Sequence, residues 1–228
     1  TVKKNTIWKE IPFSLLAALV LGILASDALI DGRSFSELSR GEGIVLIGFF
    51  AIFMYYIVSI AKEPDSEVEV EVKNLSTAKA TMFILGGLAG LVIGGKLIVD
   101  GAVEIASSIG LSESFIGLTV VAVGTSLPEL ATSAVAAYKK NVDIAVGNIV
   151  GSNIFNIFWI LGVSAIIKPL PFNPASIYDL GMTIAASVLL FIFLFVGKKH
   201  SIGKVKGILF VLIYILYIVF LSIYSSGA

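Results

Sequence analysis

Seven apolar stretches, each close to the length that a bilayer requires, limit most strongly what this chain can fold into. A helix needs about 20 apolar residues to cross the hydrocarbon core, where every backbone polar group must be satisfied internally. The composition agrees, because 57% of the 228 residues are hydrophobic, only 14% are charged and the mean hydropathy is +0.99. Soluble domains are less apolar and carry more charge. The chain is therefore predicted to be an all-α polytopic membrane protein with seven transmembrane helices, at 11–30, 43–61, 80–103, 114–138, 144–167, 176–197 and 207–224.

Basic residues are distributed unevenly between alternate loops. The N-terminus and the loops at 62–79, 139–140 and 198–206 hold twelve Lys and Arg residues, whereas the intervening loops hold only Arg33, Arg40 and Lys168. Basic residues are enriched in cytoplasmic loops. The asymmetry predicts a plasma (inner) membrane protein with its residue 1 end and 62–79 loop in the cytoplasm and its C-terminus outside.

Several function classes are excluded by composition. The chain contains no cysteine, so thiolate metal sites and cysteine nucleophiles are excluded. Sixteen basic residues balance sixteen acidic ones, and this balance gives no indication of a nucleic-acid partner. An intramembrane hydrolase would need a nucleophile and a base at the same depth, and no such pair is found. We predict a membrane transporter rather than an enzyme, with no cofactor.

The polar segment 62–79 divides the chain. Its alternating acidic residues indicate a solvated cytoplasmic linker, although a cation-sensing role is an alternative. The hairpin at 1–61 resembles a degenerate copy of the last hairpin in the five-span unit 80–228, because an offset of 164 aligns Glu42-Gly43-Ile44 with Lys206-Gly207-Ile208. An even repeat would need about three more spans before Thr1. Five-span units insert in opposite orientations, as in the inverted repeats of secondary transporters.

Two spans carry polar motifs in their middle thirds. The fourth contains Gly124-Thr125-Ser126-Leu127-Pro128-Glu129, and the fifth contains Gly147-Asn148-Ile149-Val150-Gly151-Ser152-Asn153-Ile154-Phe155-Asn156. Proline removes a backbone donor, and paired glycines weaken a helix, so both spans are predicted to be broken near the bilayer midplane. Breaks at that depth are tolerated only where the backbone faces protein or a wet cavity.

The polar groups of these motifs are all oxygen ligands. Thr125 and Ser126 share a helix face with Glu129, and Ser152 shares one with Asn156. Hydroxyl, amide and carboxylate oxygens suit Na⁺ or Ca²⁺ and disfavour zinc or copper. A charge at the bilayer centre is costly, so Glu129 is predicted to be functional.

Structural explanations remain open for some of these residues. Ser126-x-x-Glu129 is also the pattern of a capping box, and Asn156 could serve only to hold two helices together. Lys96, Asp100 and Glu104 are spaced by four, which indicates a charge-neutral ladder at a helix end. Asp27 is expected to reach the interface at the mouth of the first span.

The two motifs, at their spacing in consecutive spans, closely resemble the second α-repeat of the sodium/calcium exchanger family, within the calcium/cation antiporter superfamily. The bacterial and archaeal exchangers are the most similar type. The resemblance implies a ten-helix fold made of two inverted repeats of five, with this chain holding the fourth to tenth helices. The missing N-terminal α-repeat of the same protein would be a partner, and the fragment alone should not transport.

Residue by residue, the resemblance implies an ion site at 122–129 and 147–156. Glu129 would be the principal carboxylate, and Ala122 and Thr125 would offer backbone carbonyls. Thr125, Ser126 and Ser152 would offer hydroxyls, and Asn153 lies beside them. Asn156 would stand where many exchangers have an acidic ligand, which leaves the coupling ion and stoichiometry open. The implied function is exchange of Ca²⁺ for Na⁺ by alternating access; the alternative is an antiporter of the same fold that is coupled to H⁺ or carries another cation.

Overall fold

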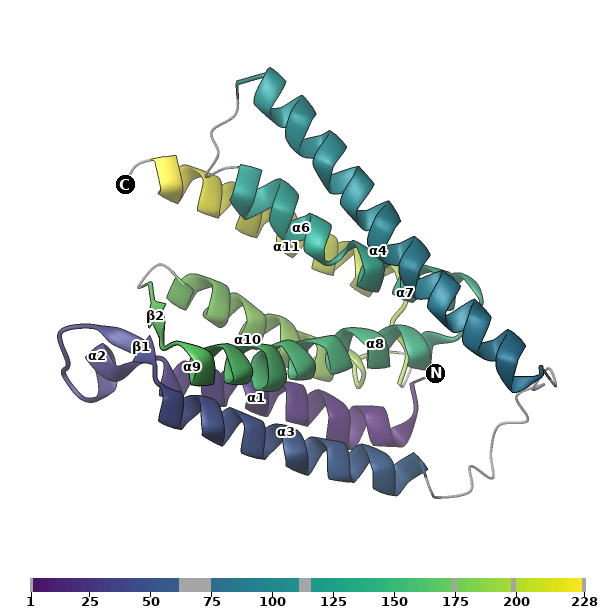
Figure 1. Ribbon diagram of the computed structural model, residues 1–228, viewed down its shortest axis with the longest axis horizontal. Helices are drawn as coiled ribbons and strands as arrows, with labels where there is room; N and C mark the ends of the chain where they lie inside the picture. The colour runs from purple at the N-terminus through teal and green to yellow at the C-terminus, as the bar shows by residue number, and fades with distance from the viewer. Residues whose placement is uncertain (1, 62–74, 111–115, 174–175, 198–199, 227–228) are drawn as a thin grey trace. The chain divides into compact units, whose positions relative to one another are not determined.

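The computed structural model describes residues 2–61, 75–110, 116–173, 176–197 and 200–226. The greater part of the expected 62–79 linker, at 62–74, lies outside the described residues. Helices dominate the chain, and one short two-stranded ribbon joins two of its loops (Figure 1). The elements are η1 (Thr6–Glu10), α1 (Ile11–Leu24), α2 (Asp27–Ile30), β1 (Ser36–Leu38), α3 (Arg40–Ala61), α4 (Thr77–Ser108), η2 (Gly117–Val121), α6 (Ala122–Thr125), α7 (Leu127–Tyr138), α8 (Val142–Ile154), η3 (Phe155–Leu161), α9 (Gly162–Ile167), β2 (Leu170–Phe172), α10 (Ser176–Phe193) and α11 (Lys204–Ser226).

Within the described residues, six helical segments are long and apolar enough to cross a membrane, in agreement with a polytopic all-helical protein. They are Thr6–Leu24, Arg40–Ile60, Thr77–Ser108, Val142–Ile167, Ser176–Phe193 and Lys204–Leu221. The predicted span at 114–138 is not among them, because its described part is divided into η2, α6 and α7. The first span also ends earlier than expected, at Leu24, and a separate turn of helix follows at α2.

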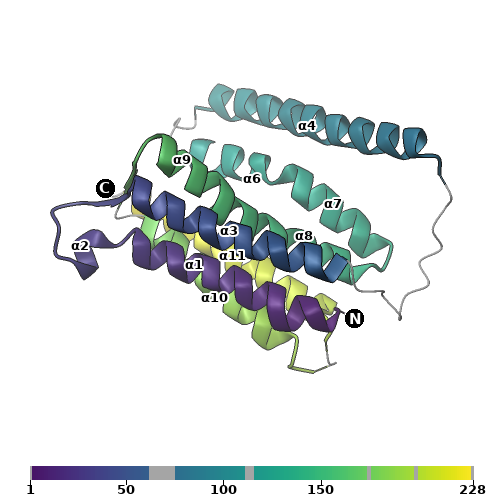
Figure 2. The ribbon, with the colours of Figure 1, turned by 60° about the horizontal axis from the view of Figure 1, so that its bottom comes forward.

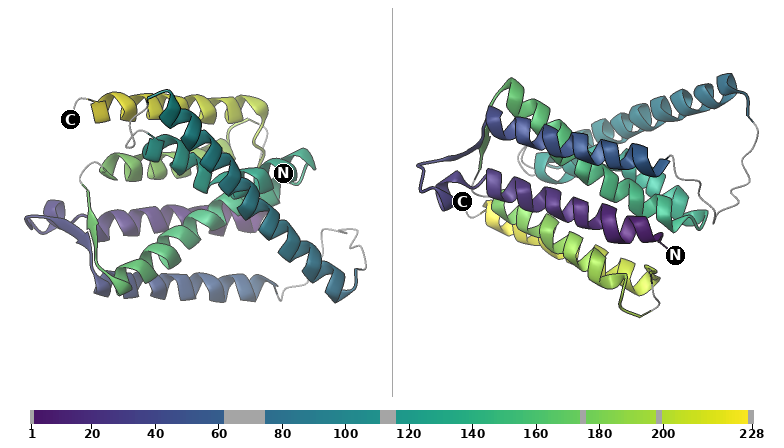
Figure 3. Two further views of the ribbon diagram at one scale, coloured as in Figure 1. Left: turned by 45° about the horizontal axis from the view of Figure 1, so that its top comes forward. Right: turned by 90° about the horizontal axis from the view of Figure 1, so that it is seen from below.

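The chain divides into two compact units. The first comprises residues 1–64 and 140–214, and the second comprises 65–139 and 215–228. In the first unit α1, α3 and α10 run in nearly the same direction, and α8, η3 and α9 cross them obliquely (Figures 2 and 3). α10 and α8 pack on α1, and η3 and α9 pack on α3. Phe158 is fully buried at this crossing, where its ring stacks on Phe49 at 5.4 Å and meets the edge of Phe13 at 5.9 Å. Aromatic packing therefore fixes α8 and η3 against the first two spans.

A pair of glycines lets α3 and α9 approach closely. A Cβ atom on Gly43 would lie 2.7 Å from the carbonyl oxygen of Gly162, and one on Gly162 would lie 3.0 Å from Ile47 Cδ1. Membrane helices lack a hydrophobic driving force between them, so small residues that permit close van der Waals packing stabilise their contacts. Gly43 and Gly162 provide this contact in the first unit.

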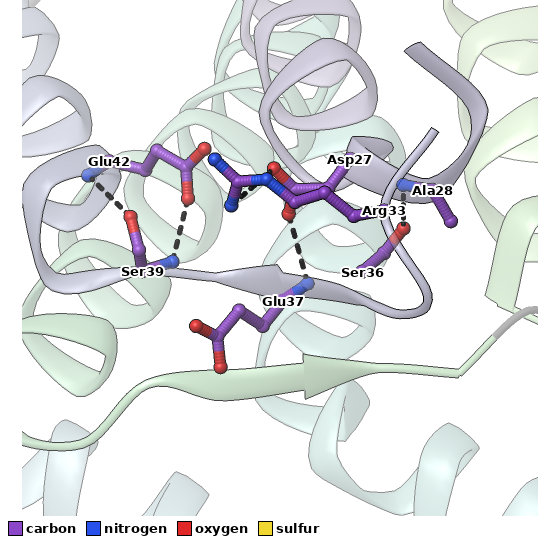
Figure 4. A network of polar contacts seen from close by, with 7 residues as sticks. All are labelled: Asp27, Ala28, Arg33, Ser36, Glu37, Ser39 and Glu42. Carbon is purple, nitrogen blue, oxygen red and sulfur yellow. Dashed lines mark hydrogen bonds and ion pairs between the residues drawn. The ribbon is translucent and has the colours of Figure 1, made fainter. Parts of the chain in front are cut away.

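A polar network links α2 and the loop that follows it to the start of α3 (Figure 4). Asp27 is buried, pairs with the Arg33 guanidinium at 3.2 Å and accepts a hydrogen bond from the Glu37 backbone N–H at 3.2 Å. Asp27 lies just beyond the first span, as expected, but its side chain does not extend to solvent, because two donors hold the carboxylate inside the loop. Strand β1, which contains Glu37, pairs antiparallel with β2, so that Ser36 lies opposite Phe172 and Leu38 opposite Leu170.

The second unit consists of α4, the divided span and the last part of α11. α4 packs along η2, α6 and α7. Lys96, Asp100 and Glu104 are exposed on α4, and among the described residues they form no ion pair with one another. The expected charge ladder is therefore not formed as direct salt bridges, which agrees with the small energy of an exposed ion pair.

Candidate cation site

The first motif lies at a break in the helix, as its proline predicts. α6 ends at Thr125, Ser126 forms a turn, and α7 begins at Leu127 with Pro128 in its first turn. The Ser126 N–H donates to the Val123 carbonyl at 3.1 Å. An unbroken α-helix would instead direct this donor to the carbonyl of Ala122, four residues back. The break therefore deprives the Ala122 carbonyl of its regular helical donor.

Proline removes the regular helical donor of a second carbonyl, that of Gly124, which the Ser126 N–H also approaches. Pro128 has no N–H, and in a regular helix its donor would serve the Gly124 carbonyl. Backbone carbonyls released in this way are suitable ligands for hard cations such as Na⁺ and Ca²⁺. The local structure thus supplies backbone oxygens beside the hydroxyls of Thr125 and Ser126.

The capping-box interpretation of Ser126 and Glu129 does not fit this geometry. The Ser126 side chain makes no capping hydrogen bond to α7. In a capping box the glutamate side chain would accept a hydrogen bond from the Ser126 N–H. This N–H instead donates to the Val123 carbonyl. Glu129 is half-buried, and its Oε2 atom is inaccessible to solvent. A cap would therefore not explain why a carboxylate lies in an apolar span.

α4 packs closely against the broken span on both sides of Ser126, at Gly124 and at Pro128. A Cβ atom on Gly124 would collide with the Val99 side chain, and the ring of Pro128 lies within 4 Å of the position that a Cβ atom of Gly95 would take. Gly124 is buried. Any larger residue at 124 would separate α6 from α4, so this glycine is needed for close packing of the broken span.

The second motif has a different local structure from the one expected. α8 continues without interruption from Val142 to Ile154 through both Gly147 and Gly151, so the predicted break at the paired glycines is wrong. The neighbouring turns support these glycines, and a single glycine costs only about 1 kcal/mol in a helix. The irregularity comes later, at Phe155, where the helix changes to the wider π form of η3.

The polar residues of the second motif lie on both sides of this change. Ser152 and Asn153 are half-buried in the last turn of α8, and Asn156 is exposed in the first turn of η3. η2 is also a π-helical segment, and it ends directly before Ala122. π-Helical turns are rare and occur frequently at functional sites. Each motif therefore adjoins a π segment, a feature that the sequence analysis did not predict.

The structure gathers the candidate residues into two local groups. Ala122, Thr125, Ser126 and Glu129 surround the helix break in the second unit, and Ser152, Asn153 and Asn156 occupy adjacent turns in the first. Within the described part of the chain, no three His, Cys, Asp or Glu side chains lie close enough together to hold a metal. Glu129 is the one carboxylate among the seven candidates.

Residues 79–223, which include both motifs, match the family described as sodium/calcium exchanger protein. This chain belongs to the sodium/calcium exchanger family. Among the relatives, CaxA of Alkalimonas amylolytica is 37% identical over 95% of the chain and 68% of its own length. The sodium/calcium exchanger MaX1 of Methanosarcina acetivorans is 40% identical over 63% of the chain and 41% of its own length.

Solved structures of the family show the same fold. A structure of the sodium-calcium exchanger NCX_Mj, from crystals soaked with Na⁺ and Sr²⁺, has a TM-score of 0.74 and 32% sequence identity to this chain. The match covers 96% of the chain and 67% of the exchanger. The chain therefore spans about two thirds of the length of this family member, and it is a multi-pass membrane protein of the exchanger fold.

Proposed function

We propose that the protein carrying this chain is a secondary active antiporter that exchanges Ca²⁺ for Na⁺ by alternating access. The observation that carries the proposal is the helix break at Ser126, which brings released backbone carbonyls and the half-buried Glu129 to one place in a member of the exchanger family. Oxygen ligands with one carboxylate favour exchangeable binding of hard cations, because a transported ion must also leave its site.

In this proposal both motifs contribute to one ion site near the bilayer midplane. Glu129 supplies the charge, the Ala122 and Thr125 carbonyls and the Thr125, Ser126 and Ser152 hydroxyls supply neutral oxygens, and Asn153 and Asn156 supply amide oxygens. Ca²⁺ takes six to eight oxygen ligands. The two local groups could provide such a number only together, and further ligands and a second negative charge are assigned to a segment equivalent to the first α-repeat.

The orientation of the chain is part of the same proposal. We place the residue 1 end and the 62–79 loop in the cytoplasm and the C-terminus outside, in the plasma (inner) membrane. The β1–β2 ribbon supports one element of this arrangement, because it joins the loops that contain Arg33 and Lys168, and these loops must therefore lie on one side.

The coupling ion is tested by transport in vesicles. The purified protein is reconstituted, and ⁴⁵Ca²⁺ uptake is measured with an outward Na⁺ gradient, with an outward H⁺ gradient at equal Na⁺, and with neither. The proposal predicts uptake only with the Na⁺ gradient. Uptake that follows the H⁺ gradient and ignores Na⁺ would assign the protein to proton coupling instead.

A binding measurement separates a transporter from a scaffold. Cations that bind the folded protein raise its unfolding temperature by mass action. We expect Ca²⁺ to raise the melting temperature of the purified protein, and Na⁺ to reduce this increase by competition. A melting temperature that neither ion changes would argue against a cation site of any kind.

A further inference from the structure

A cavity in the first unit lies beside the helix that carries the second motif, and neither motif includes its acidic residues. Its volume is about 410 Å³, and it extends along α8 from Asp143 to Ile154. This stretch of twelve residues has eleven rises of 1.5 Å between its ends, which correspond to about 16 Å of helix. Glu10, at the end of η1, lines the same cavity from the first span.

One hydroxyl group bridges the two carboxylates of this cavity. The Thr6 hydroxyl lies 3.1 Å from Asp143 Oδ1 and also makes a side-chain hydrogen bond with Glu10. A threonine hydroxyl has only one proton to donate, so it cannot serve both carboxylates at once. The negative charges of Glu10 and Asp143 act on each other, and the described residues lining the cavity include no basic side chain. Two like charges held in this way are stabilised by a shared cation.

Neighbouring basic and amide groups compensate only part of the negative charge of Glu10 and Asp143. The Lys3 backbone N–H donates to Asp143 Oδ1 at 2.8 Å, and the Lys3 charge acts on Glu10. The Lys9 ammonium lies over the Tyr56 ring, 5.3 Å from its centroid. A carboxylate has about four acceptor positions, so the two donors to Asp143 leave it able to bind a cation.

The cavity is suited to a hydrated ion rather than a bare one. One water occupies about 30 Å³ of liquid volume, so the space holds on the order of ten waters. Asn148 lines the cavity, and Ser152 and Asn156 follow it at intervals of four residues. Residues four apart lie on one helix face. Asn148 and Ser152 therefore share a face of α8 that leads from the cavity toward its C-terminal end, where the helix changes to the π form at Phe155.

We infer that this cavity is a second binding site, where a hydrated Ca²⁺ ion is held by Glu10, Asp143, Thr6 and Asn148 before it passes along α8. The identity of the ion rests on the proposed exchange function, whereas the existence of a hard-cation site rests on the cavity and its carboxylates alone. A cleft lined by charge of one sign raises the local counter-ion concentration and the association rate by about 10- to 1,000-fold. The site therefore recruits the transported ion from the side on which the cavity lies.

Equilibrium binding of ⁴⁵Ca²⁺ to the purified protein tests the site directly. The double variant Glu10→Gln, Asp143→Asn keeps the shape and one acceptor oxygen of each side chain. We expect two components in the wild-type isotherm, with the weaker one lost in the double variant and the stronger one lost in Glu129→Gln. Asp31→Asn, which removes an exposed carboxylate elsewhere in the first unit, is the matched control and should bind like wild type.

Transport kinetics provide the second readout. In vesicles with Ca²⁺ on the side of the cavity, the double variant should raise the KM about tenfold and leave the maximal rate unchanged. Glu10→Gln alone should give a smaller change of the same kind, which covers the case in which the double variant does not fold. An unchanged isotherm and unchanged KM in a folded double variant overturn the inference and leave the proposed exchange intact. If wild type shows no uptake but the double variant still loses the weaker component, the exchange proposal fails and the cation site stands.

Discussion

At the scale of single residues, the carboxylates of this chain differ in what surrounds them. Glu129 follows the helix break at Ser126, is half-buried, and has one carboxylate oxygen that solvent does not reach. Asp27 is buried in a loop, where a guanidinium and a backbone amide hold it. Removing one member of a buried pair leaves a polar group without compensation, and this cost exceeds the net stabilisation that the pair itself provides. In the proposed function the first carboxylate serves an exchangeable ligand, whereas the second stabilises the loop.

The Asp27 network gives a stability prediction. Asp27→Ala removes both the ion pair and the acceptor for the Glu37 N–H, and should lower the free energy of unfolding by about 1–3 kcal/mol. Arg33→Ala removes only an exposed partner, since the Arg33 side chain is 59% exposed, and should cost about 1 kcal/mol or less. Thermal unfolding in detergent measures both variants. Equal effects of the two substitutions would show that the backbone hydrogen bond contributes nothing.

Sequence patterns single out Glu129 but do not predict the buried contacts of Asp27, for a physical reason. A carboxylate in an apolar span is costly whatever its neighbours, so composition alone marks Glu129. The environment of Asp27 depends on Arg33 and on the pairing of β1 with β2, whose strands are separated by more than 130 residues in the chain. Three-residue strands carry almost no periodicity, so local patterns cannot predict them.

At the scale of elements, helix irregularities separate into those that the sequence encodes locally and those that packing produces. Proline removes a donor wherever it stands, and the break at Pro128 follows from the sequence. Glycine only weakens a helix, and α8 passes through Gly147 and Gly151 because its neighbours support it. The π segment at Phe155 has no proline or glycine signal and coincides with the aromatic contacts of Phe155 with Phe50 and Trp159.

The start of α3 shows a capping pattern that the sequence analysis overlooked. Ser39 Oγ accepts from the Glu42 N–H at 3.3 Å, and Glu42 Oε2 accepts from the Ser39 N–H at 2.7 Å. This is the reciprocal geometry of a capping box. The same Ser-x-x-Glu spacing at Ser126 does not form a capping box. The Ser126 N–H donates to the Val123 carbonyl, and the Ser126 side chain makes no capping hydrogen bond. The spacing alone therefore does not separate a cap from a candidate ligand.

Close packing of α3 on α9 gives a prediction with its own control. Gly43→Ala places a methyl group 2.7 Å from the Gly162 carbonyl oxygen, and because that atom belongs to the backbone, the helices must separate. Overpacking of this kind costs about 1–3 kcal/mol. Gly48→Ala lies on the same helix, meets nothing within 4 Å, and should be neutral or slightly stabilising through helix propensity.

Thermal unfolding of both glycine variants in the same detergent distinguishes the two positions. A lower melting temperature for Gly43→Ala than for Gly48→Ala supports the helix contact. Equal melting temperatures would mean that the approach of α3 to α9 does not contribute to stability.

At the scale of the whole molecule, each compact unit carries one motif. The break at Ser126 lies in the second unit, and the α8–η3 junction lies in the first. In secondary transporters, ligands from separate helix groups form one midplane site, and relative motion of the groups exposes it to either side. Under the proposed function, each unit would supply part of the ligand set.

The sequence predicted the class of fold and the helix break in the first motif, because hydrophobicity and proline act locally. It predicted neither the π segments nor the cavity between η1 and α8, because both arise from contacts between distant parts of the chain. Thr6 and Asp143 are separated by 137 residues, and neither belongs to a recognisable motif. The acidic pair at Glu10 and Asp143 becomes visible only when the first span packs on α8.

The central claim is that Glu129 holds the transported ion, and one measurement tests it most directly. ⁴⁵Ca²⁺ uptake driven by an outward Na⁺ gradient is compared for wild type and Glu129→Gln at equal amounts of folded protein. Loss of the carboxylate removes an interaction of about 3–5 kcal/mol with a buried cation, so uptake should fall at least about 100-fold. Uptake by Glu129→Gln within twofold of wild type would contradict the account.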